Sequence, residues 1–300
     1  MYEQIAKNKR ISFLLVLFFL VLVFLMVWAF NEVTGWGTGG LVLAVVIALA
    51  MTWGGYYYSD KIVLAVSKAR PVSKPEYPYL YNVVEGLALA AGLPKPRCYV
   101  IDDTAPNAFA SGRNPENSVI VVTTGLLDKL NRAELEGVIA HEMSHIKNYD
   151  VRLQTVAVVM VGVVALLSDW ILRSFFWGGG RRRSRDSKGG GNAGAIFLVV
   201  AIVLAILSPL VAQLLKLAIS RKREFLADAN GAMLTRYPPG LASALRKLAA
   251  DKEPLEVANN ATAHLYIVNP LKAARKGVKA SKLFSTHPPI EERIAALEKM

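Results

Sequence analysis

Two histidines four positions apart carry the clearest chemistry in this sequence. They belong to the pentad His141-Glu142-Met143-Ser144-His145, and on a helix such a spacing puts both imidazoles on one face, where they can reach the same ion. Imidazole suits zinc, and a catalytic zinc needs three protein ligands so that a fourth position stays open for water. Glu142 lies one step round the helix, where its carboxylate could take a proton from that water. The alternative, two surface histidines whose hydrogen bonds are satisfied, would make this spacing a coincidence.

A third ligand has to come from elsewhere in the chain. The other histidines are His264 and His287, and the acids Glu224 and Asp228 follow the last long apolar run. On a helix these two acids would lie one turn apart, so one could bind the metal while the other orients a ligand imidazole through its free N–H. A solvated acid pair beside the basic residues 221–223 is the competing interpretation.

The elements that position these residues include membrane spans, because the chain is too apolar for an ordinary soluble protein. Of its 300 residues, 53% are hydrophobic and 19% are charged, and the mean hydropathy is +0.35. A formal charge of +12 would suggest a nucleic-acid partner in a soluble protein. Beside apolar spans, basic residues kept on the cytoplasmic side are the simpler source, so we expect no nucleic acid. The single cysteine, Cys98, excludes an intrachain disulfide and a cysteine-based metal cluster.

Two uncharged runs near the N-terminus, residues 11–30 and 41–58, are long enough to cross a bilayer as helices. The linker between them has no Lys or Arg, whereas basic residues precede the first run and follow the second. This bias places both flanks in the cytoplasm. The first run is too long for a secretory signal and has no cleavage site, which predicts an uncleaved anchor.

A second pair of apolar runs, residues 153–168 and 193–215, is less regular. The first is short for a crossing and the second is long enough, and the Gly-rich loop between them, residues 178–192, is basic. If both runs cross, this loop emerges on the far side, against the usual charge rule. A shallow hairpin would instead leave the loop on anionic cytoplasmic lipid. We favour two crossings, and hence four hydrophobic helices, because the last run is so long.

Between the two pairs, residues 61–150 have the pattern of a globular α/β mixture. Helical periodicity over 79–91 stops at Gly92, a residue that can adopt the left-handed conformation that ends helices. Three short β-branched or alternating runs, 97–102, 107–111 and 118–122, predict a small antiparallel sheet. Asn131 and Glu134 have the spacing of a capping box and should open the helix that carries the histidine pentad to about residue 149.

Four motifs, in this order, resemble the membrane-bound zinc metallopeptidases of the HtpX type, distant relatives of the type I CAAX prenyl proteases. They are residues 107–110, 141–145, 223–228 and 284–289. The resemblance covers nearly the whole chain, including the placement of the four hydrophobic runs. It implies an α+β, mainly helical integral membrane protein with a zincin-like metallopeptidase domain, a small antiparallel sheet and four hydrophobic helices.

The expected division has four parts. Residues 1–60 form an N-terminal transmembrane hairpin, and 61–150 form the first part of a cytoplasmic peptidase domain. Residues 151–218 form the second hydrophobic hairpin with its basic loop, and 219–300 form the second part of the peptidase domain, with the third zinc ligand.

The resemblance also implies roles for single residues. It implies one zinc ion per chain, held by His141, His145 and Glu224, with Glu142 as the general base and Asp228 as the partner of a ligand histidine.

Further roles follow from the remaining motifs. An exposed strand, Asn107, Ala108, Phe109 and Ala110, could hold a substrate backbone by edge pairing, although an ordinary sheet edge fits equally well. His287 resembles a position where relatives place a histidine near the active site, and it could donate a hydrogen bond to a developing oxyanion. A helix-cap histidine is the alternative there. His264 matches no ligand position, and we expect it to be structural.

The expected function is zinc-dependent endopeptidase activity in protein quality control during stress. Its substrates would be misfolded or damaged membrane proteins and cytosolic proteins, cut on the cytoplasmic face of the cell membrane by a multi-pass protein. One alternative is an intramembrane metalloprotease, which the charges around the pentad disfavour. Another is a catalytically silent scaffold or transporter component, which zinc content would distinguish.

Overall fold

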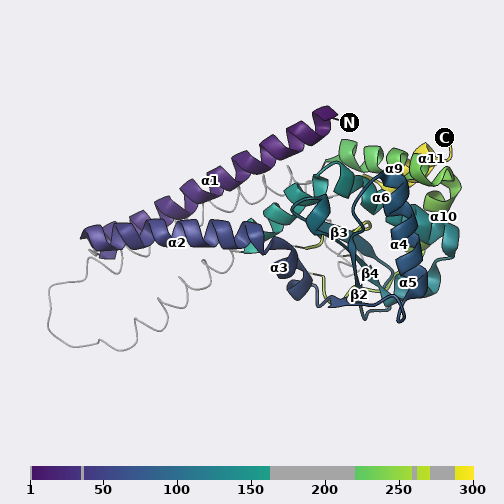
Figure 1. Ribbon diagram of the computed structural model, residues 1–300, viewed down its shortest axis with the longest axis horizontal. Helices are drawn as coiled ribbons and strands as arrows, with labels where there is room; N and C mark the ends of the chain where they lie inside the picture. Colours follow the sequence, from purple (N-terminus) through teal and green to yellow (C-terminus); the bar gives the residue numbers. More distant parts are fainter. Residues whose placement is uncertain (1, 35–36, 163–219, 259–261, 271–287) are drawn as a thin grey trace.

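The computed structural model describes residues 2–34, 37–162, 220–258, 262–270 and 288–300. Within these ranges, a long helical hairpin extends from a globular part that contains a small sheet surrounded by helices (Figure 1). The N-terminal end of the hairpin's first helix returns to the globular part, near the end where the C-terminus also lies.

The hairpin consists of α1 (Tyr2–Thr34) and α2 (Gly37–Tyr57). Two stretches in these helices, Glu3–Leu25 and Gly37–Tyr57, are long and apolar enough to cross a membrane. Large hydrophobic side chains such as Phe13 and Val42 are exposed along them, as expected for surfaces that face lipid rather than water. The first two predicted runs are therefore helical, and α1 also includes the charged residues that precede the first run.

A third apolar helix packs against this hairpin. Residues 150–162 are helical, and they form one buried cluster with α1 and α2. The cluster contains Leu15, Phe19, Val23, Ala48, Leu153, Val156 and Met160. The rest of the third predicted run, the fourth run (193–215) and the basic loop (178–192) lie outside the described residues.

The sheet has four strands in the order β1-β2-β4-β3. Their bounds are Arg70–Pro71 for β1, Arg97–Ile101 for β2, Ala108–Gly112 for β3 and Ser118–Thr123 for β4. The β3–β4 and β1–β2 pairs are antiparallel, but β2 and β4 are parallel. The prediction of an antiparallel sheet was therefore wrong for the central pair. In the β3–β4 hairpin, β4 is the inner strand and pairs with β2. An alternating sequence pattern identifies a strand but does not identify which strand lies beside it.

Seven further α-helices and a short 3₁₀-helix, Pro115–Asn117, belong to the described globular part. The α-helices are α3 (Ser59–Val66), α4 (Pro78–Ala91), α5 (Thr124–Lys129), α6 (Arg132–Lys147), α9 (Arg221–Thr235), α10 (Pro238–Ala250) and α11 (Ile290–Leu297). As predicted, α4 ends at Gly92 in the left-handed region, with φ of 67°. The capping box of α6 is also confirmed: Asn131 Oδ1 accepts from the Glu134 N–H at 3.0 Å, and Glu134 Oε2 accepts from the Asn131 N–H at 2.8 Å.

Helix α6 lies at the centre of the globular part, with most of its side chains buried. It contributes Leu135, Val138, Ile139, Met143 and Ile146 to the largest core cluster. Two glycines let the neighbouring helices approach its backbone. A Cβ on Gly137 would lie 2.7 Å from the backbone N of Leu241 in α10, and one on Gly231 of α9 would lie 3.0 Å from the backbone N of His141. The histidine pentad is thus held in a tightly packed helix.

Candidate metal centre

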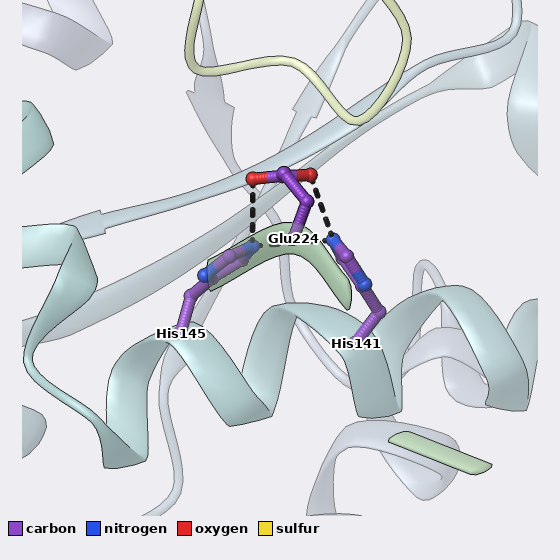
Figure 2. Close-up of side chains that lie close together, drawn as sticks. All are labelled: His141, His145 and Glu224. Atoms are coloured by element: carbon purple, nitrogen blue, oxygen red, sulfur yellow. Dashed lines mark hydrogen bonds and ion pairs between the residues drawn. The ribbon is translucent and has the colours of Figure 1, made fainter. Parts of the chain in front are cut away.

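Helices α6 and α9 bring His141, His145 and Glu224 together. Both histidines project from α6 toward the Glu224 carboxylate, which comes from the first turn of α9 (Figure 2). The two Nε2 atoms are 3.2 Å apart. His145 Nε2 lies 3.6 Å from Glu224 Oε1, and His141 Nε2 lies 3.8 Å from Glu224 Oε2. All three residues are buried, with exposures of 1%, 4% and 3% respectively.

The outer nitrogen of each imidazole faces a carboxylate. His141 Nδ1 lies 2.9 Å from Asp228 Oδ1, and His145 Nδ1 lies 3.0 Å from Asp150 Oδ2. A carboxylate accepts hydrogen bonds, so in a neutral imidazole the proton belongs on Nδ1 and the lone pair on Nε2. In this protonation state both Nε2 lone pairs face each other and the Glu224 carboxylate, so a cation bound between them would relieve their repulsion. The Arg293 guanidinium lies at the border of the same site, 3.5 Å from His141 Nε2 and 3.6 Å from Glu224 Oε2.

These separations suit a tetrahedral divalent ion. Zinc bonds of about 2.0–2.1 Å require ligand atoms roughly 3.3–3.4 Å apart, close to the distances among these three side chains. Within the described ranges, they are the only three His, Cys, Asp or Glu residues that converge in this way. The donor set therefore fits a metal ion.

Asp228 is held by a buried arginine that the sequence analysis missed. Arg293 of α11 has no exposed surface, and it donates to Asp228 Oδ2 at 2.8 Å and to Oδ1 at 2.6 Å. Burial would raise the pKa of Asp228, but the Arg293 charge and its hydrogen bonds outweigh burial and lower it. The only signal in the sequence is positional: Arg293 shares the buried face of α11 with Ile290 and Leu297, where an apolar residue would be expected.

The sequence also did not identify Asp150 as a partner of His145. It was considered only as one of the charged residues near the pentad that argue against an intramembrane site. Burial lowers the pKa of His145, but the hydrogen bond to Asp150 and the charge of Glu224 outweigh burial and raise it to about 9. The second oxygen of Asp150, Oδ1, lies 3.4 Å from Arg223 Nε of α9 and 2.7 Å from Asn8 Nδ2 of α1.

Glu142 is buried beside the two histidines and bonds to the sheet. Its Oε2 accepts a hydrogen bond from the Ala110 N–H of β3 at 2.8 Å. Burial raises the pKa of Glu142 to about 7, with the nearby charge of His145 opposing the shift and that of Glu224 adding to it. A carboxyl group with a pKa near neutrality can both take and return a proton, as a general base requires.

The segment Asn107, Ala108, Phe109 and Ala110 does lie along the edge strand of the sheet, but the expectation that it is exposed was wrong. All four residues are at most 4% exposed. The Ile267 N–H donates to Ala108 O at 3.0 Å, and Asn107 Nδ2 donates to Val268 O at 2.9 Å. Because the backbone groups of an edge strand require partners, these contacts and the packing of Tyr266 against Phe109 show that residues 266–268 cover part of this edge. Substrate binding there remains a prediction and would require that segment to move.

His264 is not brought into the cluster. It is buried, at 2% exposure, two residues before the segment that covers β3, and it is not among the three converging metal-ligand residues. Its expected structural role remains a prediction. His287 lies outside the described residues.

The chain matches a protein family and several known proteins. Residues 75–300 match Peptidase family M48. A protein called "Protease HtpX homolog" from Dictyoglomus turgidum is 52% identical over 299 residues, which cover 100% of this chain and 94% of that protein. A protein of the same name from Thermoanaerobacter pseudethanolicus is 45% identical over 304 residues, covering 100% and 98%. Among solved structures, the crystal structure of S. mikatae Ste24p matches with a TM-score of 0.48 and 22% identity, covering 92% of this chain and 62% of that one.

Proposed function

The chain belongs to peptidase family M48 and is a metalloprotease, and from this premise we propose that it is a membrane-anchored zinc endopeptidase. It hydrolyses peptide bonds of misfolded or damaged membrane proteins, and of cytosolic proteins, on the cytoplasmic side of the cell membrane. The two apolar helices of the hairpin support the membrane anchor, and the basic residues that flank them support the cytoplasmic side.

One observation carries the proposed zinc site. The Nε2 atoms of His141 and His145 and the carboxylate of Glu224 converge in a buried site, while each Nδ1 atom faces a carboxylate. In this proposal these three residues hold one zinc ion per chain. Carboxylate partners such as Asp228 and Asp150 fix the tautomer and orientation of a ligand imidazole. When bound, zinc supplies a water of lowered pKa and polarises the scissile carbonyl.

Glu142 performs the proton transfers in this mechanism. The Ala110 N–H holds one oxygen of its carboxylate, so the other oxygen is the one that takes the proton from water and returns it to the departing amine. A positioned general base contributes about 10²- to 10⁴-fold to the rate. His287 stays a candidate donor to the oxyanion, and residues 107–110 stay a candidate substrate strand.

The domain division remains part of the proposal. Residues 61–150 and 219–300 would form one peptidase domain that is interrupted by the second hydrophobic hairpin, residues 151–218. The packing of α6 against α9 and α10 supports this division, because the two parts share one core.

Zinc content and proteolysis of the purified full chain test the proposal together. We expect about one zinc per parent chain and chelator-sensitive hydrolysis of casein, an unfolded soluble substrate. Glu142→Gln should keep its zinc and lose at least roughly 100-fold in rate, since it removes only the base. Glu224→Ala should lose zinc. Glu136→Gln, on the partly exposed face of α6, is the matched control and should behave like the parent.

The outcomes separate the alternatives. A zinc-free parent chain without hydrolysis would favour a silent scaffold. Cleavage only within membrane spans, with casein left intact, would favour an intramembrane protease. If Glu142→Gln cut casein at the parent rate, Glu142 would not be the base.

A further inference from the structure

Asp150 reaches His145 through a tight turn that follows α6. The helix ends at Lys147, and residues 150–162 are helical again. Between them, Tyr149 adopts a left-handed conformation with φ of 59°. For a bulky residue this conformation is unfavourable and persists only where the surrounding structure holds it. The position of the Asp150 carboxylate therefore depends on whatever holds this turn.

The N-terminal end of α1 contacts every residue of the turn. Asn8 Nδ2 donates to Asn148 O at 2.9 Å and to Asp150 Oδ1 at 2.7 Å. The ammonium group of the next residue, Lys9, lies 4.2 Å from the centroid of the Tyr149 ring. Asn8 is 1% exposed, so water does not compete for these hydrogen bonds. A helix more than a hundred residues away in sequence thus holds the turn in place.

The same contacts continue to the candidate metal centre. Asp150 is 1% exposed and uses both of its oxygens: Oδ1 accepts from Asn8, and Oδ2 faces His145 Nδ1 at 3.0 Å. With one oxygen held by Asn8, the carboxylate cannot rotate away from the imidazole without losing a buried hydrogen bond. The orientation of His145 therefore depends on Asn8 through Asp150.

We propose that Asn8 is a positioning residue of the metal centre, which makes the N-terminal membrane helix a structural part of that centre as well as an anchor. The inference rests on the proposed function, because it assigns His145 as a metal ligand. It goes beyond that function by making metal binding depend on how α1 docks on the peptidase domain.

Zinc affinity of the purified full chain, measured by competition with a chelator, tests this role. Asn8→Ala should bind zinc roughly 3- to 30-fold more weakly, somewhat less than the 10- to 100-fold loss typical of a residue that contacts a metal ligand directly. Lys7→Ala, at an exposed position on the same helix, should bind like the parent. Cobalt-loaded Asn8→Ala should also have an altered visible absorption spectrum, whereas cobalt-loaded Lys7→Ala should not.

A double-mutant cycle with Asp150→Ala tests the route. If Asn8 acts through Asp150, adding Asn8→Ala to Asp150→Ala should weaken zinc binding little further, whereas independent effects would add. Additive losses of zinc affinity in the double mutant would overturn this inference but leave the proposed function intact. The same holds if Asn8→Ala has the zinc affinity and cobalt spectrum of the parent. A parent chain that binds no zinc would overturn the proposed function, and this inference with it.

Discussion

The charges of individual buried residues explain why the candidate metal centre would attract a cation. Four buried carboxylates belong to this cluster: Glu142, Asp150, Glu224 and Asp228. Two guanidinium groups, of Arg223 and Arg293, face them. Among the described residues, these buried carboxyl groups therefore outnumber the guanidinium groups that face them. Because buried charge is unfavourable unless it is paired, a divalent ion between the histidines and Glu224 would be favoured by this excess of acids.

Arg293 should contribute strongly to stability. Arg293→Met would leave the Asp228 carboxylate buried without its charged partner, and we expect it to lower the free energy of unfolding by about 3–5 kcal/mol. Thermal unfolding of the metal-free full chain in detergent measures this effect. Arg246→Met is the matched control, because Arg246 pairs with Glu298 at a half-exposed site, where such pairs contribute at most about 1 kcal/mol. Equal losses of Tm in the two variants would contradict the assigned role of Arg293.

Among the helices and strands, the packing of α6 against α9 and α10 has the largest effect on the geometry of the candidate metal centre. The histidines and Glu224 come from different helices, so the distances between them depend on how closely α6 approaches α9 and α10. Gly137 and Gly231 permit that approach because they have no Cβ. Small residues at helix contacts therefore determine the geometry of the centre as directly as the ligand-type residues do.

Gly137→Ala should destabilise the protein even though alanine favours helix formation. Its Cβ would lie 2.7 Å from the Leu241 backbone N and 2.8 Å from its Cα, so α10 would have to move. Overpacking of this kind typically costs about 1–3 kcal/mol. At Gly86, in the interior of α4, no atom lies within 4 Å of an added Cβ, and Gly86→Ala should stabilise by up to about 1 kcal/mol. Opposite shifts of Tm in the two variants would support this account, and a stabilised Gly137→Ala would refute it.

Considered as a whole, the described residues combine an apolar helical hairpin, long enough to cross a membrane, with a peptidase part whose stability should depend on metal and pH. The α1 helix connects the two by packing against the turn beside Asp150. The cluster of buried charges lies close to this junction, so its protonation affects the stability of the entire fold.

The metal-free protein should lose stability as the pH rises from about 7 to about 9. The pKa of His145 is raised to about 9 in the folded chain, against about 6.5 when unfolded. The folded state therefore retains a proton that the unfolded state has released, and this stabilisation disappears as the pH rises through 9. The slope is at most about 1.4 kcal/mol per pH unit. Zinc binding requires deprotonated histidines, so zinc should raise Tm more at about pH 8.5 than at about pH 7. A flat or rising Tm of the metal-free protein over this interval would contradict the prediction.

Local features were predictable from the sequence because they depend on residues close together along the chain. The capping box of α6, the end of α4 at Gly92 and the two apolar helices of the hairpin all follow from short-range spacing and composition. The shared helical face of His141 and His145 follows from the same periodicity.

Only the tertiary structure decided which distant segments meet. The parallel β2–β4 pair, the cover over β3, and the contacts of Arg293 with Asp228 and of Asn8 with Asp150 all join residues far apart in sequence. Such contacts are selected by packing and by the need to pair buried polar groups, and neither leaves a local pattern in the residues involved. The sequence alone therefore determined the residue types and local elements of the candidate metal centre, whereas folding determined the partners that surround it.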